Sequence, residues 1–374
     1  MIPLRAWTEI DLSAYERNLK NIKAALPSNV SFISVVKADA YGHGLPQIVE
    51  RSLQSGIETF AVANIQEATE IRNVGVGWPI LLLGALMPGE EKYIPDSEFI
   101  PTISSLEELI RLQRVCEDKQ VIVKLHLKID TGMGRLGLWY ADTNECIARI
   151  QASPNLKLSG IYTHFSDPIN DPQFTEVQRQ RLESVIATIK SNSLISIHAD
   201  SSASFNALSV SPPYNAVRIG LLQYGVLPYP NMQSLNISVT PTLSFYTKVG
   251  LVKTLPKGCS ISYGRSHQLN RDSKIAILTA GYGDGIPLPY SGRGSVIIQD
   301  KLCPILGRIT MDQIIVDVTD LKSVRSGERV ILIGSSKSCS ISLERFCQDS
   351  DSIPWEVLCS ITKRVQRVYT NPRT

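Results

Sequence analysis

The sequence predicts an α/β fold in which a (β/α)8 barrel of the TIM type is followed by a predominantly β domain. In the first two-thirds of the 374 residues, short apolar runs alternate with amphipathic helical patterns, as expected for parallel strands joined by helices. In the last third, apolar residues recur with period two and are interrupted by Gly and Pro. No Gly-x-Gly-x-x-Gly turn follows an early strand, which disfavours a doubly wound open sheet. We therefore predict two domains, residues 1–235 and residues 236–374.

Eight apolar runs are candidates for the barrel strands, and a count of eight favours closure of the sheet into a barrel. They are residues 32–37, 59–63, 79–83, 99–103, 121–129, 158–164, 195–199 and 217–222. The run at 99–103 is short and is also compatible with a loop.

Helical patterns separate several of these runs. In the first, apolar residues recur at three- and four-residue steps, at Leu12, Tyr15, Leu19, Ile22 and Leu26. We expect this helix to begin at a capping box formed by Ser13 and Glu16 and to stop at Pro27. Another helix is expected over residues 174–190.

Residues 227–236 are rich in Pro, Asn, Ser and Gln, which is typical of a linker. Beyond the linker, the alternating runs predict strands at residues 249–254, 274–278, 295–298, 313–318 and 329–333.

The composition is that of an ordinary globular protein, with 43% hydrophobic and 20% charged residues. The formal charge of +3 is small and the basic residues are scattered, so we expect neither nucleic acid nor an anionic membrane as a partner. We see no secretory signal at the N-terminus and no apolar stretch long enough to span a bilayer. The seven cysteines are odd in number, widely spread and without a Cys-x-x-Cys pair, which argues against a metal site and a disulfide framework and favours a cytoplasmic setting.

In a (β/α)8 barrel, residues just past the carboxyl ends of the strands form the active site. Chemically capable side chains fall there, namely Lys37, Tyr41, Lys128, Asp130, Arg135, His164, Ser201, Ser202 and Arg218. Lys37 leaves an apolar run for a Gly-bracketed loop, where partial burial would lower its pKa and free its amine to form a Schiff base with an aldehyde. Each residue also has a structural interpretation, such as a lysine stem lying over a strand end, a hydrogen-bonded core histidine, a helix-capping serine or an arginine in a surface ion pair. Convergence of all of these residues on one rim of the barrel favours an active site over separate structural roles.

Residues 36–44, Val-Lys-Ala-Asp-Ala-Tyr-Gly-His-Gly, closely resemble the pyridoxal-phosphate attachment motif of alanine racemases. The resemblance continues in order through residues 7–12, 128–137, 162–165, 217–220, 262–265, 281–285 and 307–313. It therefore covers nearly the whole chain and both predicted domains.

This resemblance implies the interconversion of L- and D-alanine with pyridoxal 5'-phosphate as cofactor, which supplies D-alanine for bacterial peptidoglycan. It also implies a head-to-tail homodimer whose active sites share residues of both subunits. Inverting a stereocentre requires a base on each face of Cα. By resemblance, Lys37 would hold the cofactor and serve the D-alanine face, and the partner subunit's Tyr263 would serve the L-alanine face. His164 would bond Tyr263 and meet Arg218, whose guanidinium would face the cofactor's pyridine nitrogen and leave it unprotonated.

The remaining roles also come from the resemblance. The cofactor phosphate would be held by Tyr41, Ser202, Ile219 and Gly220. Arg135 would contact the cofactor's phenolic oxygen and the substrate carboxylate, which Met311 and Asp312 of the other subunit would also bind. Tyr282 resembles the family's entrance tyrosine, and Lys128 matches a lysine that is carbamylated in some members and then positions the arginine.

The chain departs from the family pattern at Ser201, Asp39 and Thr310, and at Trp355, where many members have a tyrosine near the phosphate. An indole N–H donates one hydrogen bond but accepts none, so we expect a differently shaped cofactor cleft with Trp355 in its wall. Three alternatives stay open: a serine or broad-specificity racemase on the same fold, a single-domain cofactor carrier, and an aldolase that uses Lys37 directly. The downstream module disfavours the carrier, and the lack of a signal peptide disfavours the periplasmic broad-specificity relatives.

Overall fold

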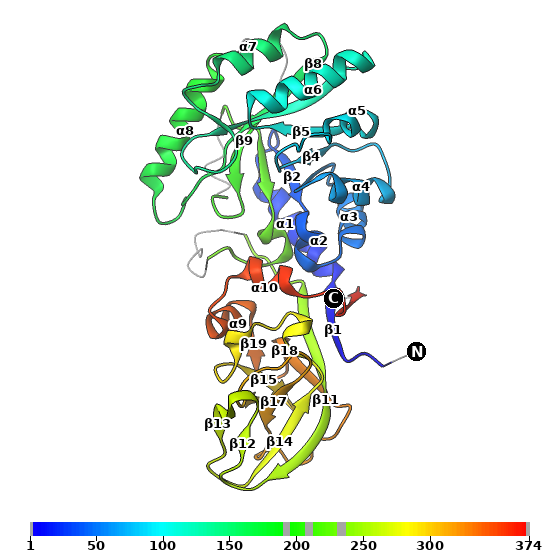
Figure 1. The fold of residues 1–374 in the computed structure, drawn as a ribbon, viewed down its shortest axis with the longest axis vertical. Coiled ribbons are helices and arrows are strands. Elements are labelled where there is room, and N and C mark those ends of the chain that lie inside the picture. Colours follow the sequence, from blue (N-terminus) through cyan, green and yellow to red (C-terminus); the bar gives the residue numbers. More distant parts are fainter. Residues whose placement is uncertain (1–2, 190–194, 206–211, 230–236, 372–374) are drawn as a thin grey trace.

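The computed structural model describes residues 3–189, 195–205, 212–229 and 237–371, and places them in a barrel above a β-rich unit (Figure 1). In these residues, eight parallel strands form the barrel, and β10 pairs with β2 to close it. In barrel order the strands are β2 (Ser31–Val35), β3 (Thr59–Val62), β4 (Ile80–Leu82), β5 (Phe99–Ile103), β6 (Val123–Asp130), β8 (Leu156–Tyr162), β9 (Ser196–Ser201) and β10 (Ala216–Ile219). The predicted barrel is confirmed, including the short strand at 99–103.

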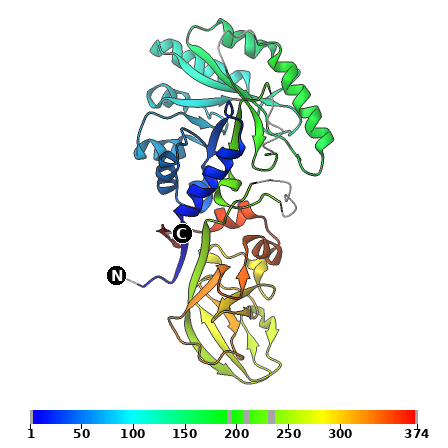
Figure 2. The same cartoon turned by 180° about the vertical axis from the view of Figure 1, so that it is seen from behind.

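Helices cover the outside of the barrel (Figure 2). They are α1 (Leu12–Ala25), α3 (Leu45–Gln54), α4 (Ile65–Val74), α5 (Ile94–Ser97), α6 (Leu106–Lys119), α7 (Asn144–Ala152) and α8 (Pro172–Ile186). The expected helix at 174–190 is therefore α8, and residue 190 lies outside the described residues. A short strand, β7 (Leu138–Trp139), pairs with the end of β6.

The predicted capping box of the first helix is wrong. The N-cap of α1 is Asp11, whose carboxylate accepts a hydrogen bond of 2.8 Å from the backbone N–H of Ala14, so Ser13 lies inside the helix. Glu16 instead pairs with Lys20 and Arg51 on the surface. The helix ends at Ala25, two residues before the proline that was expected to stop it.

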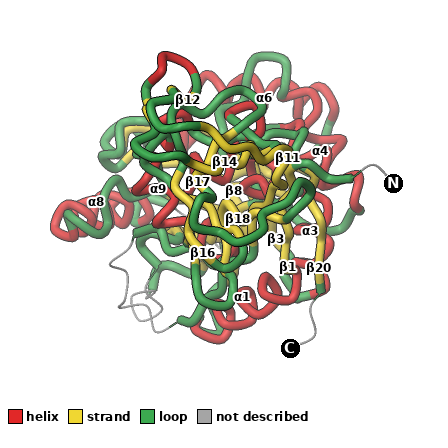
Figure 3. Tube along the Cα trace, turned by 90° about the horizontal axis from the view of Figure 1, so that it is seen from below, coloured by secondary structure: helices red, strands yellow, loops and turns green. Residues whose placement is uncertain are grey.

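The second unit is the predicted β-rich module, and its sheet includes the first and the last described strands of the chain. Its long strand β11 (Leu243–Leu255) pairs with β1 (Ala6–Asp11), which in turn pairs with β20 (Gln366–Thr370). Its other strands are β12 (Ser260–Ile261), β13 (His267–Gln268), β14 (Ser273–Leu278), β15 (Ser295–Ile298), β16 (Lys301–Pro304), β17 (Ile314–Asp317), β18 (Arg329–Ser335) and β19 (Ser340–Ile341). Seen from below, these strands lie near the centre, with barrel helices around them (Figure 3). The proposed domain boundary at 235/236 lies outside the described residues, and β1 shows that the N-terminal segment pairs with the second unit.

Two helices connect the second unit to the barrel. They are α9 (Leu343–Ser350) and α10 (Pro354–Ser360), and α10 packs beside the segment α2 (Lys37–Gly42) at the barrel mouth (Figure 1). One cluster of buried apolar side chains runs through both units, while a small separate cluster of Ile261, Leu269, Ile275 and Leu306 lies at the β12–β13 hairpin. None of the helices in the described segments is long and apolar enough to cross a bilayer.

Candidate active site

A cavity of about 560 Å³ opens at the barrel mouth, where the resemblance placed the site. It brings together most of the sequence-predicted residues of the barrel. Those that line it are Lys37, Tyr41, Lys128, Arg135, His164, Ser201, Ser202, Arg218 and Gly220, with Trp355 contributed by α10. Ile219 is fully buried and its side chain does not line the cavity.

The segment that follows Lys37 is a left-handed turn. Ala38, Asp39, Ala40 and Tyr41 all have φ of 53° or 54°, although none of them is glycine. Each such residue costs about 1–2 kcal/mol because Cβ crowds the following carbonyl oxygen. A run of four therefore needs support from the surrounding structure, as strained backbone at functional sites generally does.

Hydrogen bonds from both flanks support this turn. Glu67 accepts a bond of 2.7 Å from the backbone N–H of Ala38, and the Asp39 carboxylate accepts one of 2.8 Å from the backbone N–H of Leu45. The buried His43 ring places Nδ1 2.9 Å from the Tyr41 carbonyl and 3.1 Å from the Ala40 carbonyl, so Nδ1 carries the proton and donates. Asp39 thus has a structural role at this position, as an acceptor at the start of α3.

The cavity is strongly cationic. Burial, followed by the nearby Arg135 guanidinium, lowers the pKa of Lys37, and the same two causes lower the pKa of Lys128 to about 8. The described residues that line the cavity include Arg218 as a further cation but no Asp or Glu. A site of this kind suits a ligand with phosphate or carboxylate groups, and it contains a lysine whose amine loses its proton readily.

Arg218 is buried at 4% exposure and is held by neutral acceptors. Its two terminal nitrogens donate to the carbonyls of Thr163 and Ala199, each at 2.9 Å, and of His198 at 3.2 Å. No carboxylate of the described residues forms an ion pair with it, so the interpretation of a surface ion pair is wrong. Burial lowers the pKa of Arg218 to about 10, which leaves it protonated at neutral pH. Its Nε donates to none of the described residues and is the N–H available to a ligand in the cavity.

The hydrogen bonds of Arg218 fix the protons of the neighbouring histidines. Because a guanidinium only donates, Nδ1 of His164, at 3.2 Å, and Nδ1 of His198 must accept. His198 therefore carries its proton on Nε2 and donates it to Nδ1 of His126, 3.0 Å away. Burial lowers the pKa of His126 to about 3 and those of His164 and His198 well below 6.5, so all three rings are neutral at pH 7.

Sequence reasoning missed His126 and His198. A signal was present, because side chains two residues apart on a strand share a face. For His126 this signal was available, because it stands two positions before Lys128 on β6. For His198 it was not, because Asp200, two positions further along β9, pairs with Arg179 of α8 and does not line the cavity. The two rings contact each other and His198 contacts Arg218, so both histidines belong to the hydrogen-bond network of Arg218.

Ser202, Tyr41 and Gly220 form a small cradle at the edge of the cavity. The Ser202 hydroxyl oxygen accepts bonds from the backbone N–H groups of Gly220 at 2.9 Å and Leu222 at 3.3 Å, which leaves its own proton free to donate. A Cβ at position 220 would lie 2.4 Å from the Tyr41 hydroxyl oxygen, so only glycine lets that hydroxyl approach the backbone. Two hydroxyl donors beside a close backbone approach fit a phosphate group.

Besides Ile219, Asp130 of the barrel does not line this cavity, and its carboxylate accepts the backbone N–H groups of Gly132 and Gly134. Four predicted residues of the second unit do not line it either. Tyr263, Tyr282, Met311 and Asp312 all belong to the second unit and are exposed, with Tyr263 at 70% and Met311 at 53%. Tyr263 lies in a short turn between β12 and β13, where Ser262 and Arg265 have positive φ and the Ser262 hydroxyl donates to the Arg308 carbonyl. In the described residues of one chain, therefore, Tyr263 lies outside the cavity that contains Lys37.

Comparisons with known proteins match the whole chain. Residues 10–228 match the family described as Alanine racemase, N-terminal domain, and residues 242–369 match Alanine racemase, C-terminal domain. The chain is 36% identical over 369 residues to the alanine racemase of Halothermothrix orenii, with 98% of this chain and 97% of that protein covered. It is 35% identical over 365 residues to that of Methylacidiphilum infernorum, with 98% and 92% covered.

Solved structures are similar over the same extent. Alanine racemase from a D-cycloserine-producing Streptomyces lavendulae has a TM-score of 0.91 at 28% identity, with 100% of this chain and 99% of that chain covered. The enzyme of Bacillus anthracis with bound L-Ala-P has a TM-score of 0.90 at 29% identity, with 99% and 96% covered. The enzyme of Bartonella henselae with covalently bound pyridoxal phosphate has a TM-score of 0.88 at 28% identity, with 98% and 100% covered.

Proposed function

Because the chain belongs to the alanine racemase family, we propose that it interconverts L- and D-alanine with pyridoxal 5'-phosphate, using Lys37 and the partner subunit's Tyr263 as its two bases. Family membership confirms the predicted resemblance and the predicted class of enzyme, an amino-acid racemase. The cofactor, the two bases, the homodimer and a cytoplasmic supply of D-alanine for peptidoglycan are parts of the proposal. The observation that carries it is a half-buried lysine of lowered pKa, in a cavity that also contains Arg135 and Arg218 and has no Asp or Glu among its described lining residues.

The cavity fits the cofactor. When bound, pyridoxal phosphate supplies an electron-accepting ring that stabilises negative charge on Cα of the amino acid. Lys37 would hold its aldehyde carbon, and the cradle of Tyr41, Ser202 and Gly220, with the backbone of Ile219, would hold the phosphate. Arg218 would donate through Nε to the ring nitrogen. Because guanidinium keeps its proton, Arg218 would leave that nitrogen unprotonated, so that the ring would withdraw less charge and return of the Cα proton would be favoured.

Proton transfer on the first face belongs to Lys37. Burial and the cationic neighbours favour its neutral amine, which can take a proton from Cα of D-alanine and give one back. Arg135 would hold the substrate carboxylate, with Met311 and Asp312 of the partner subunit. A carbamylated Lys128 would be anionic and would hold Arg135, and its pKa of about 8 supports that modification.

The second face is assigned to Tyr263, which lies outside the cavity of its own chain. The partner subunit's Tyr263 would fill the role, which accounts for a 70% exposed tyrosine in a well-packed hairpin. The tautomer of His164 supports this role of Tyr263. Because His164 accepts from Arg218 on Nδ1, it carries its proton on Nε2 and can donate to the phenolate oxygen of that tyrosine. Tyr282, also exposed, would line the entrance from the partner's side.

The test is to incubate purified, cofactor-loaded protein with single enantiomers of alanine and of serine in deuterated water. Loss of optical activity together with deuterium at Cα is expected for alanine. Lys37→Ala should abolish the absorbance of the lysine-bound cofactor, whereas Tyr263→Phe should keep that absorbance and lose turnover. Formation of pyruvate without inversion would overturn the proposal, and equal turnover of serine would favour the broad-specificity alternative.

A further inference from the structure

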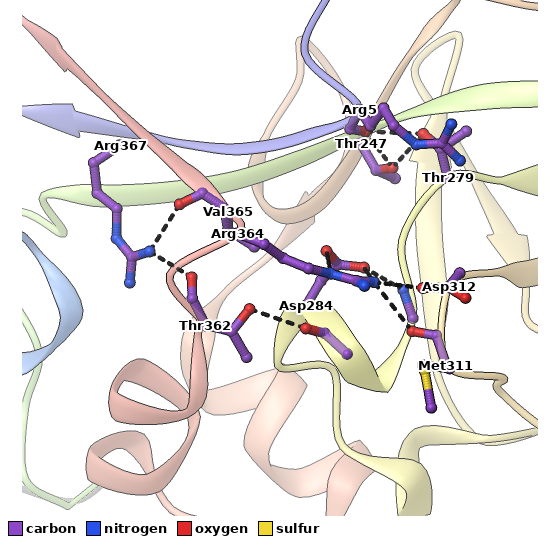
Figure 4. A network of polar contacts seen from close by, with 12 residues as sticks. Arg5, Thr247, Thr279, Asp284, Met311, Asp312, Thr362, Arg364, Val365 and Arg367 are labelled. Carbon is purple, nitrogen blue, oxygen red and sulfur yellow. Dashed lines mark hydrogen bonds and ion pairs between the residues drawn. The ribbon is translucent and has the colours of Figure 1, made fainter.

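Arg367, on β20, binds the turn that carries Lys37. Its Nε donates to the Gly42 carbonyl at 3.0 Å. Its terminal nitrogens donate to the carbonyls of Thr362 at 2.6 Å and Val365 at 2.8 Å (Figure 4), and to that of Ile361 at 2.7 Å. No carboxylate of the described residues is its ion-pair partner, and burial lowers its pKa. The guanidinium therefore joins a tight bend of the C-terminal segment to the left-handed turn.

The same C-terminal segment also packs directly against that turn. A Cβ at Gly42 would lie 2.2 Å from the Leu358 carbonyl oxygen, and one at Gly44 would lie 1.8 Å from the Tyr369 hydroxyl oxygen. Tyr369 donates from this hydroxyl to the His43 carbonyl at 3.2 Å. Because the two segments fit with no spare room, a shift of residues 358–369 would move the turn that carries Lys37.

Arg364, three residues before Arg367, binds a different set of groups (Figure 4). Its guanidinium makes two bonds to the Asp284 carboxylate, at 2.7 and 2.9 Å, and others to the Asp312 carboxylate at 2.8 Å and the Met311 carbonyl at 3.3 Å. Asp284 is buried and accepts the backbone N–H of Gly281 at 2.9 Å. Arg364 thus ties the turn that carries Tyr282 to the loop of Met311 and Asp312.

The two arginines therefore hold different halves of an active site. Arg367 holds the turn that belongs to the chain's own cavity, and Arg364 holds the exposed loops that lie outside it. From these contacts, and resting on the shared-site dimer proposed above, we propose that both are positioning residues that act on opposite sites of the dimer. Arg367 acts in cis on the site containing its own Lys37, and Arg364 acts in trans on the partner's site.

Single variants test the division of roles. Lysine keeps the charge but loses the planar fork that reaches several acceptors, so Arg367→Lys and Arg364→Lys are suitable. Arg367→Lys should raise the Kd of pyridoxal phosphate about tenfold, because a small misplacement of a reactive group costs up to about a hundredfold in rate or binding. Arg364→Lys should leave that Kd within about twofold and raise KM for alanine about tenfold, as expected when substrate contacts weaken. Arg271→Lys, which alters an exposed pair with Asp320, is the matched control.

Mixed dimers test the direction of action. A chain with Lys37→Ala has a dead cavity but intact loops, so in a mixed dimer only the other chain's cavity works. Adding Arg364→Lys to the Lys37→Ala chain should raise KM at the surviving site, and adding it to the other chain should leave KM at the wild-type value. Adding Arg367→Lys to the other chain should raise the Kd of pyridoxal phosphate at the surviving site. Adding it to the Lys37→Ala chain should leave that Kd at the wild-type value. Effects in the reverse chains, or equal effects in both, would overturn the proposal.

A separate pairing isolates the underlying dimer. Chains with Lys37→Ala and with Tyr263→Phe, each inactive alone, should regain one active site when mixed. Failure of this pair would reject the shared site itself. If this pair regains activity but each arginine variant has the same effect in either chain, only the positioning roles are rejected. If the arginine variants lose thermal stability and do not affect Kd and KM separately, the arginines have a general structural role instead.

Discussion

Gly220→Ala provides a sharp test of the phosphate cradle. The added Cβ would lie 2.4 Å from the hydroxyl oxygen of Tyr41 and 3.0 Å from its Cζ, both inside normal contact distance. Tyr41 is 6% exposed and its ring packs against Tyr224 with centroids 5.2 Å apart, so it has little room to retreat. The substitution therefore forces the hydroxyl away from the position where we propose that it meets the phosphate.

The expected magnitude follows from the cost of overpacking. Inserting a methyl group into a packed site costs about 1–3 kcal/mol, which corresponds to a roughly 5- to 150-fold rise in the Kd of pyridoxal phosphate. Tyr41→Phe alone removes the hydroxyl and one charge-assisted hydrogen bond, for a rise of about tenfold. In the Tyr41→Phe background the clashing oxygen is gone, so Gly220→Ala should add little. The two changes should therefore be strongly non-additive.

The assay is an absorbance titration of the lysine-bound cofactor for the wild type, both single variants and the double variant. Thermal unfolding of the four cofactor-free proteins checks that the fold is kept. Binding by Gly220→Ala within about twofold of the wild type would refute the reasoning, as would an equal additional loss in the presence and absence of Tyr41→Phe.

Three further predictions concern His43, Lys128 and Trp355. Burial lowers the pKa of His43 to about 4, below its unfolded value of 6.5. Because the unfolded chain then binds the proton more tightly, the free energy of unfolding should fall by about 3 kcal/mol as the pH drops from 6.5 to 4. His43→Asn, which keeps a donor for the turn, should flatten this slope in urea unfolding at pH 7 and 5, and an unchanged slope would contradict the assignment. The pKa of Lys128 near 8 predicts that about half of its amine is neutral at pH 8 and that bicarbonate adds one carboxyl group there, visible by native mass spectrometry and absent in Lys128→Arg. A native mass without that addition would refute the proposal that Lys128 is carbamylated. Trp355 and Tyr229 line the cavity with ring centroids 6.4 Å apart. Trp355→Tyr should therefore change the Kd of the cofactor, or the ratio of serine turnover to alanine turnover, about fivefold. No change in either quantity would count against a role of Trp355 in the wall of the cleft.

The sequence predicted the barrel well because strand period and strand count are local signals. Residues 99–103 form β5 as expected, and the C-terminal alternation marked β14, β15, β17 and β18. It could not reveal that β1 leaves the barrel domain to pair with β11 and β20, because that pairing joins residues more than 200 positions apart. Most of the predicted residues of the barrel rim came together because they lie at the carboxyl ends of parallel strands or just past them. The residues that act through others, such as His198 and Arg367, were missed because their roles depend on partners brought close only by the fold.

The turn after Lys37 shows most clearly why local reasoning has a limit here. Alanine is the best right-handed helix former, so Ala38 and Ala40 by themselves would favour the opposite hand from the one observed. Four left-handed residues cost several kcal/mol together, at about 1–2 kcal/mol each, and the compensating contacts come from Glu67, from His43 and Leu45 just after the turn, and from residues 358–369. Part of this support requires the C-terminal strand β20 to be paired with β1. We therefore expect the position of Lys37 to depend in part on the far end of the chain. Removal of the segment after residue 357 should weaken binding of pyridoxal phosphate at Lys37, measurable as loss of the lysine-bound absorbance. Normal absorbance in that truncated chain would show that the turn is stable without these contacts.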